Sequence, residues 1–178
     1  PVTGKITDTS ECKSSEAFNV KGLVLRASTP DTLSCVEYSY DEDTETLTLL
    51  HINAGFNCCP GKISCKISTS NDTILIEEKE EQSICDCDCL YDLTIMLENV
   101  LTGEYIIKFI EPYSHDMKEL IFNVDFTKLS VGEFCVTRKS FNTFLNFYKI
   151  RVSKIYNYSN QSSAVTVIPL FGDEVHLA

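Results

Sequence analysis

Apolar and polar residues alternate along much of this 178-residue chain, and the clearest case is the segment 85–97. Every odd position in this segment is apolar or cysteine, while the even positions are mostly polar, with Leu90 and Met96 as exceptions. A strand turns successive side chains to opposite faces. The segment is therefore predicted to be a strand whose core side carries three cysteines at alternate positions.

The same alternation predicts seven further strands, separated by turn sequences such as Ser70-Asn71-Asp72. These strands are expected at residues 32–40, 46–53, 62–68, 73–78, 104–111, 120–127 and 133–138. Short strands at this close spacing are typical of an antiparallel sandwich. The sequence thus predicts an all-β fold, an antiparallel β-sandwich of the immunoglobulin-like kind.

The pattern changes near the C-terminal end of the chain. Four apolar or aromatic residues between 141 and 148 follow helical spacing after Ser140, a residue type that caps helices, so one short helix is predicted near 140–148. A last strand is expected at 164–168. We expect a single domain over residues 1–178, with a polar leader at 1–17, a β-sandwich core at 18–138 and a C-terminal extension at 139–178 packed on that core.

Composition and charge argue against some of the classes to which this protein could belong. The net charge of −11 argues against nucleic acid as a partner. No apolar run approaches the ~20 residues that a transmembrane helix needs. The chain opens at Pro1 without a methionine. We interpret this as the removal of an N-terminal segment, and a lipid anchor upstream of residue 1 fits the same interpretation.

Basic residues gather in one region, because residues 138–172 contain five of them and no acidic residue. This region is a weak candidate for an anionic-ligand patch, made of Arg138, Lys139, Lys149, Arg151 and Lys154. A basic segment that faces water or lies against an acidic body is the more common arrangement.

Nine cysteines are many for a cytosolic protein of this length, because thiols in the cytosol stay reduced. Cysteines two apart on one strand have Cα atoms ~6.5–7 Å apart, an awkward distance for bonding to one another. We therefore expect at least one disulfide between residues 58–59 and residues 85–89. The candidates are Cys58, Cys59, Cys85, Cys87 and Cys89.

Two other uses of these cysteines remain open. They could hold zinc, which accepts Cys and His ligands, or copper, since thiolate-rich sites also suit copper(I). The candidate ligands are His51, Cys58, Cys59, Cys85, Cys87 and Cys89. Alternatively, some of the thiols are free and buried, packed as small hydrophobic side chains.

Catalysis has little support in the sequence. His51 with Cys58 is the one pair of base and nucleophile that the sequence suggests, and neither a nucleophile elbow nor a Gly-rich phosphate loop accompanies it. We therefore expect no catalytic residues and, unless the cysteines bind a metal, no cofactor.

Several short motifs in the middle of the chain resemble a known group of proteins. The motifs are His51-Ile52-Asn53, Phe56-Asn57-Cys58-Cys59-Pro60, the run Cys85-x-Cys87-x-Cys89-x-Tyr91-Asp92-Leu93, Gly103-x-Tyr105 and Glu111-Pro112. Their pattern, H-x-N…F-N-C-C-P…C-x-C-x-C-x-Y-D-L, resembles small uncharacterised secreted proteins and lipoproteins of Bacteroidetes and other bacteria. The resemblance covers about residues 33–138 and implies a β-sandwich outside the cytoplasm. It implies no activity and transfers no functional residue.

These observations together predict an extracytoplasmic binding or interaction module, in the periplasm or on the bacterial cell surface. We expect it to be held together by disulfides, to lack catalysis and to bind an unknown protein or glycan. The alternative is a metal-binding protein that uses the cysteine-rich segments for zinc or copper.

Overall fold

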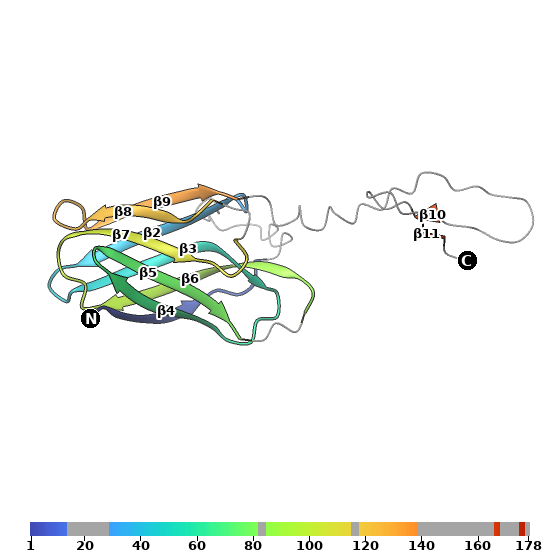
Figure 1. Cartoon of the computed structure of the whole chain (residues 1–178), viewed down its shortest axis with the longest axis horizontal. Coiled ribbons are helices and arrows are strands. Elements are labelled where there is room, and N and C mark those ends of the chain that lie inside the picture. The colour runs from blue at the N-terminus through green and yellow to red at the C-terminus, as the bar shows by residue number, and fades with distance from the viewer. Residues whose placement is uncertain (14–28, 82–84, 115–117, 139–165, 168–174, 177–178) are drawn as a thin grey trace, which may run out of the picture. The chain divides into compact units, whose positions relative to one another are not determined.

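The computed structural model describes residues 1–13, 29–81, 85–114, 118–138, 166–167 and 175–176 of the chain (Figure 1). The chain divides into two compact units, Pro1–Lys139 and Ser140–Ala178. In the second unit, β10 (Thr166–Val167) pairs with β11 (Val175–His176) in antiparallel fashion. β10 lies within the strand predicted at 164–168, whereas the predicted helix near 140–148 falls outside the described residues.

The first unit contains a five-stranded antiparallel sheet with the order β1-β6-β3-β2-β9. Its strands are β1 (Thr3–Thr9), β2 (Leu33–Asp41), β3 (Thr46–Asn57), β6 (Asp88–Glu98) and β9 (Val131–Thr137). Hydrophobic side chains of β3 and β6 alternate between the faces as the sequence predicted, with Leu47, Leu49, Leu93 and Ile95 fully buried. These two central strands supply much of the core.

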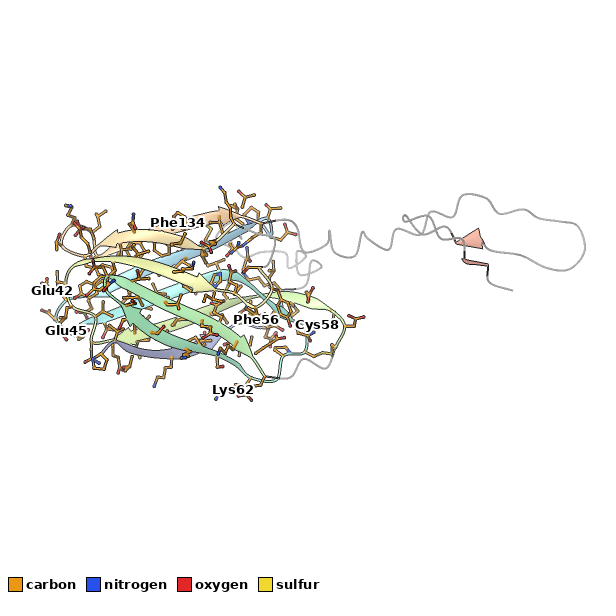
Figure 2. All side chains as sticks on the ribbon, in the orientation of Figure 1. Glu42, Glu45, Phe56, Cys58, Lys62 and Phe134 are labelled. Carbon is orange, nitrogen blue, oxygen red and sulfur yellow. A yellow bond between two sulfur atoms is a disulfide. The ribbon has the colours of Figure 1, made fainter. Side chains whose placement is uncertain are left out.

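A second sheet has four strands in the order β4-β5-β7-β8. Its strands are β4 (Ile63–Ser70), β5 (Thr73–Glu80), β7 (Glu104–Ile110) and β8 (Ile121–Asp125). β5 and β7 are parallel, with Ile76 opposite Phe109, while the other two pairs are antiparallel. Figure 1 shows the two sheets as facing layers, and the side chains in Figure 2 fill the space between them.

The predicted all-β sandwich is confirmed, and no helix occurs among the described residues, hence none that could cross a membrane. The prediction that all neighbouring strands are antiparallel was wrong, because β5 and β7 are parallel neighbours. After β5 the chain crosses to the five-stranded sheet, where it forms β6, and then returns to the four-stranded sheet as β7. A crossover connection of this kind allows β7 to lie parallel to β5. An immunoglobulin-like arrangement stays a prediction.

Two segments differ from their predicted roles. Residues 3–9, placed in a polar leader, form the edge strand β1, which pairs through its backbone with β6 and needs few apolar side chains to do so. The strand predicted from residue 85 begins only at Asp88, so that Cys85 and Cys87 lie ahead of it and do not face the core. Cys89 is the one cysteine of the three that is buried in the strand.

A β-bulge near Asn53 reverses the inward and outward positions of β3. The pairing of β3 with β6 shifts between His51 and Ala54, and Asn53 has a φ of 63°. Asn tolerates this left-handed conformation better than most residues. His51 therefore points inward before the bulge, and Ala54 and Phe56 point inward after it.

Candidate functional site

Four disulfides use eight of the nine cysteines. Cys12–Cys89 fastens the segment after β1 to β6, and Cys35–Cys135 joins directly opposed residues of β2 and β9. Cys58–Cys87 and Cys59–Cys85 join the segment after β3 to the segment before β6. These last two bonds are the linkage that the sequence predicted between residues 58–59 and 85–89.

We call Cys58, Cys59, Cys85 and Cys87 the disulfide cluster. The sulfur atoms of the neighbouring residues Cys58 and Cys59 are 3.9 Å apart although they belong to different bonds. Figure 2 places Cys58 at the end of the sandwich opposite Glu42 and Glu45. Cys87 is exposed and the other three residues are half-buried, so the cluster is open to solvent.

Asn57 organises the backbone around the disulfide cluster. Its side-chain amide donates to the carbonyl of Cys85, and its side-chain oxygen accepts from the amide of Cys59 at 2.8 Å. Its own backbone amide donates to Glu80 at 2.9 Å, and its carbonyl accepts from the hydroxyl of Tyr91 at 3.1 Å. Much of the F-N-C-C-P and Y-D-L pattern thus has a structural role.

A second constellation lies between the two sheets, and sequence reasoning missed most of it. We call it the inter-sheet polar cluster, and its members are Ser34, His51, Glu78, Glu111 and Arg138. The Nε2 atom of His51 is 2.9 Å from the Ser34 hydroxyl, and its Nδ1 atom is 2.7 Å from Glu78 Oε1. Arg138 binds Glu111 and the carbonyl of Lys118. Glu111 Oε1 lies 3.8 Å from His51 Nε2 and connects the two pairs.

The charges in the inter-sheet polar cluster balance when His51 is protonated. Burial lowers the pKa of His51, but the charge and hydrogen bond of Glu78 and the charge of Glu111 outweigh burial, and the pKa is raised. Burial raises the pKa of Glu111, and the charges of His51 and Arg138 offset only part of that rise. With His51 protonated and both acids ionised, two cations would face two carboxylates across the sheets, where an unpaired charge is costly.

Ser34, His51 and Glu78 have the connectivity of a serine-histidine-acid triad, but the arrangement does not suit catalysis. Ser34 and His51 are 0% exposed and Glu78 is 2% exposed, so no substrate reaches the hydroxyl. The raised pKa of His51 favours the protonated imidazole, which donates from both nitrogens and cannot take the proton of Ser34. The hydrogen bonds of His51 to Ser34 and Glu78 instead connect β2 and β3 of one sheet to β5 of the other.

A signal for the inter-sheet polar cluster was present in the sequence. Each charged member continues an inward-facing apolar row: Ile74 and Ile76 precede Glu78, Ile107 and Phe109 precede Glu111, and Phe134 and Val136 precede Arg138. Reading those rows one position further would have placed Glu78, Glu111 and Arg138 inside. The alternation alone does not show that they meet.

The structure separates the residues proposed as metal ligands. His51 lies among Ser34 and Glu78, and Cys89 is bonded to Cys12, so neither belongs to the disulfide cluster. The sulfur atoms of Cys58, Cys59 and Cys85 lie within 4.8 Å of one another, close enough to hold a metal ion in principle. The suggested pair of His51 and Cys58 is not formed, because each side chain has other partners.

Of the five residues proposed as an anionic-ligand patch, Arg138 alone lies in the described part of the chain. Arg138 is 6% exposed and paired with Glu111, so its guanidinium is engaged inside the sandwich. Lys139, Lys149, Arg151 and Lys154 fall outside the described residues, and an anionic-ligand patch made by them stays a prediction.

Comparison of the chain with protein-family models, with curated proteins and with solved structures finds no match.

Proposed function

We propose that this chain is an extracytoplasmic module that binds a partner and has no catalytic role. The observation that carries the proposal is the set of four disulfides, which leaves Cys65 as the single free cysteine. Disulfides of this number form and persist in oxidising compartments and are rare in the cytosol. The resemblance to secreted proteins and lipoproteins supports the same compartment, with a lipid anchor attached ahead of residue 1.

The compartment can be tested in the cells that make the protein. Intact cells are treated with a membrane-permeant alkylating reagent, and the cysteines are then mapped by mass spectrometry without reduction. We expect Cys65 to be the main alkylated residue, and alkylation of the eight other cysteines in mature protein would contradict the proposal. Labelling with a fatty-acid analogue tests the lipid anchor separately.

The proposed absence of catalysis rests on the burial of Ser34 and on the raised pKa of His51, which favours the protonated imidazole. A fluorophosphonate probe, which labels activated serines, should leave Ser34 unmodified in the folded chain. Labelling at Ser34 that disappears in a His51→Gln variant would show a working triad and would contradict the proposal.

We further propose that the partner is a protein that contacts the outer face of the four-stranded sheet. Three isoleucines lie on that face: Ile106, Ile110 and Ile121, which are 38%, 43% and 38% exposed. Ile121 lies directly opposite Lys108, which sits between Ile106 and Ile110 on β7. Aliphatic side chains grouped on a sheet favour contact with another protein surface. Glu77 pairs with Lys79 at 3.0 Å and Glu119 with Lys108 at 3.1 Å, so the charges of this face are largely balanced and its aliphatic side chains carry the assignment.

Charge substitution tests this face. Ile106→Lys with Ile121→Lys should abolish photo-cross-linking to the partner protein in intact cells. The matched control is Leu129→Lys with Val131→Lys, because these residues are 63% and 60% exposed and belong to the turn and strand that follow β8. Equal loss of cross-linking in both variants would contradict the assignment to this face. Binding to a glycan panel that is unchanged in both variants would contradict the assignment of a protein partner.

A further inference from the structure

The disulfide cluster brings four sulfur atoms into one small volume. Cys58 and Cys59 are adjacent in sequence, and their partners Cys87 and Cys85 are two residues apart, so the two bonds lie next to each other. The sulfurs of Cys58, Cys59 and Cys85 are mutually within 4.8 Å, and the sulfur of Cys87 is bonded to that of Cys58. No other part of the described chain holds four cysteines together.

The positions of these cysteines do not depend on the sulfur–sulfur bonds alone. The amide of Cys58 donates to the carbonyl of Cys87 at 2.9 Å, and Asn57 bridges the amide of Cys59 and the carbonyl of Cys85. β3 and β6 continue this pairing, since Phe56 lies opposite Cys89 and Asn57 opposite Asp88. The backbone therefore holds the four side chains near one another after the bonds are reduced.

The surroundings of the cluster favour a cation. Asp86 and Asp88 flank Cys87 in the chain, and the carboxylate of Glu80 accepts from the backbone amide of Asn57 at 2.9 Å, so several carboxylates crowd this end of the sandwich. The exposed Cys87 gives a reductant and a metal ion access from solvent.

We propose that Cys58, Cys59, Cys85 and Cys87, when reduced, form a closed tetrathiolate site for one zinc ion. Structural zinc is held by four Cys ligands in a tetrahedron with Zn–S distances of about 2.3 Å, which places neighbouring sulfurs about 3.8 Å apart. The observed separation of the Cys58 and Cys59 sulfurs is 3.9 Å. The sulfurs of each bonded pair must separate from bonding distance to this spacing, and reduction of the two disulfides permits that separation.

Zinc binding and disulfide bonding use the same four sulfurs and exclude each other. Each disulfide accepts two electrons and two protons from an external dithiol, which is oxidised to its own disulfide. Zinc then displaces the four thiol protons and binds four thiolates. Two external disulfides accept the four electrons and, with four protons, become dithiols, which restores both disulfides of the cluster and releases the zinc. The site thus responds to the redox state of its surroundings, independently of any partner on the four-stranded sheet.

The experiment uses the full chain. It is reduced with a phosphine under anaerobic conditions, loaded with zinc, desalted and analysed for bound metal, and cobalt is loaded in parallel because tetrahedral cobalt thiolates absorb strongly in the visible range. We expect about one metal ion per reduced chain and none on the oxidised chain. The Cys12→Ser/Cys89→Ser variant should bind the same amount, while Cys59→Ser/Cys85→Ser should lose binding.

A second measurement guards against loss of fold in the variants. Reduced wild-type chain is alkylated with and without zinc, and each cysteine is mapped. Zinc should protect the four cysteines of the disulfide cluster and leave Cys12 and Cys135 reactive. Absence of bound zinc, protection of other cysteines, equal metal loss in both variants, or retention of copper(I) but not zinc would each overturn the zinc assignment.

Discussion

The disulfide cluster and the inter-sheet polar cluster join distant parts of the chain by different means. The first links segments within one sheet covalently, at an end of the sandwich that is open to solvent. The second links the two sheets through buried charges and hydrogen bonds, because Ser34, His51 and Arg138 belong to one sheet or its ends and Glu78 and Glu111 to the other. One linkage depends on redox conditions and the other on protonation.

This difference means that each region can be broken while the other stays intact. Reduction leaves every charge of the inter-sheet polar cluster in place. A change of pH within the neutral range leaves every disulfide in place. The contributions of the two regions to the free energy of unfolding are therefore separable by experiment.

The largest effect is expected for His51→Ala. It leaves Glu78 buried without its cationic partner, and breaking a buried pair in this way costs about 3–5 kcal/mol. Urea unfolding monitored by far-ultraviolet circular dichroism measures the loss. Thr48→Ala, which changes the other face of β3, serves as the control, and His51→Leu/Glu78→Leu should recover much of the stability because no charge is left unpaired. A loss below about 1 kcal/mol for His51→Ala would contradict the importance of the pair.

The next effect concerns the two bonds of the disulfide cluster, which close nearly the same loop. They span 29 and 26 residues. Removing one by Cys58→Ala/Cys87→Ala leaves the other to close that loop, so we expect a loss of only about 1–2 kcal/mol. Removing both should cost about 3–4 kcal/mol and lower the Tm by roughly 6–16 °C. Differential scanning calorimetry measures both values, and equal losses for single and double removal would contradict the shared loop.

A smaller effect is expected from pH. The folded-state pKa of His51 is raised, so its contribution to stability is complete below the ordinary histidine pKa and is lost as pH rises through the raised value. The raised pKa of Glu111 acts in the same direction at lower pH. The urea midpoint should therefore fall as pH rises above about 6.5, the ordinary histidine pKa, and this fall should shrink in the His51→Leu/Glu78→Leu variant. A midpoint that rises over this range would contradict the protonated His51.

The smallest effect is expected at Cys65, the free cysteine. Burial and the charge of Glu78 raise the pKa of this thiol to about 11. Alkylation of the native chain near pH 8 should therefore be about a hundredfold slower than that of an exposed thiol. Cys65→Ala should change stability by less than about 1 kcal/mol, because the side chain is only partly buried. Rapid alkylation of native protein would show that β4 opens readily.

The sequence predicted the strands well, because period-two alternation records directly which side chains face the core. It also predicted which two cysteine-rich segments are bonded, because alternate cysteines on one strand lie at an awkward distance for bonding to one another, although Cys85 and Cys87 lie just ahead of the strand. It did not predict the pairing of Cys12 with Cys89 or of Cys35 with Cys135, since strand order in a sheet depends on contacts between residues far apart in the chain. The inter-sheet polar cluster was missed for the same reason: Glu78 and Arg138 look like ordinary strand ends until the two sheets face each other.

The connectivity of the four disulfides has a consequence for how the protein is made. None of the bonded pairs, Cys12–Cys89, Cys35–Cys135, Cys58–Cys87 and Cys59–Cys85, consists of consecutive cysteines. In the oxidising compartment proposed for this protein, a chain that enters N-terminus first presents Cys12 and Cys35 before Cys89, so we expect the earliest bonds to be non-native. Correct pairing then requires repeated exchange between thiolates and disulfides, a process that takes seconds to hours depending on the oxidant and on an isomerase. Efficient production of this protein should therefore depend on a host that supplies disulfide isomerase activity.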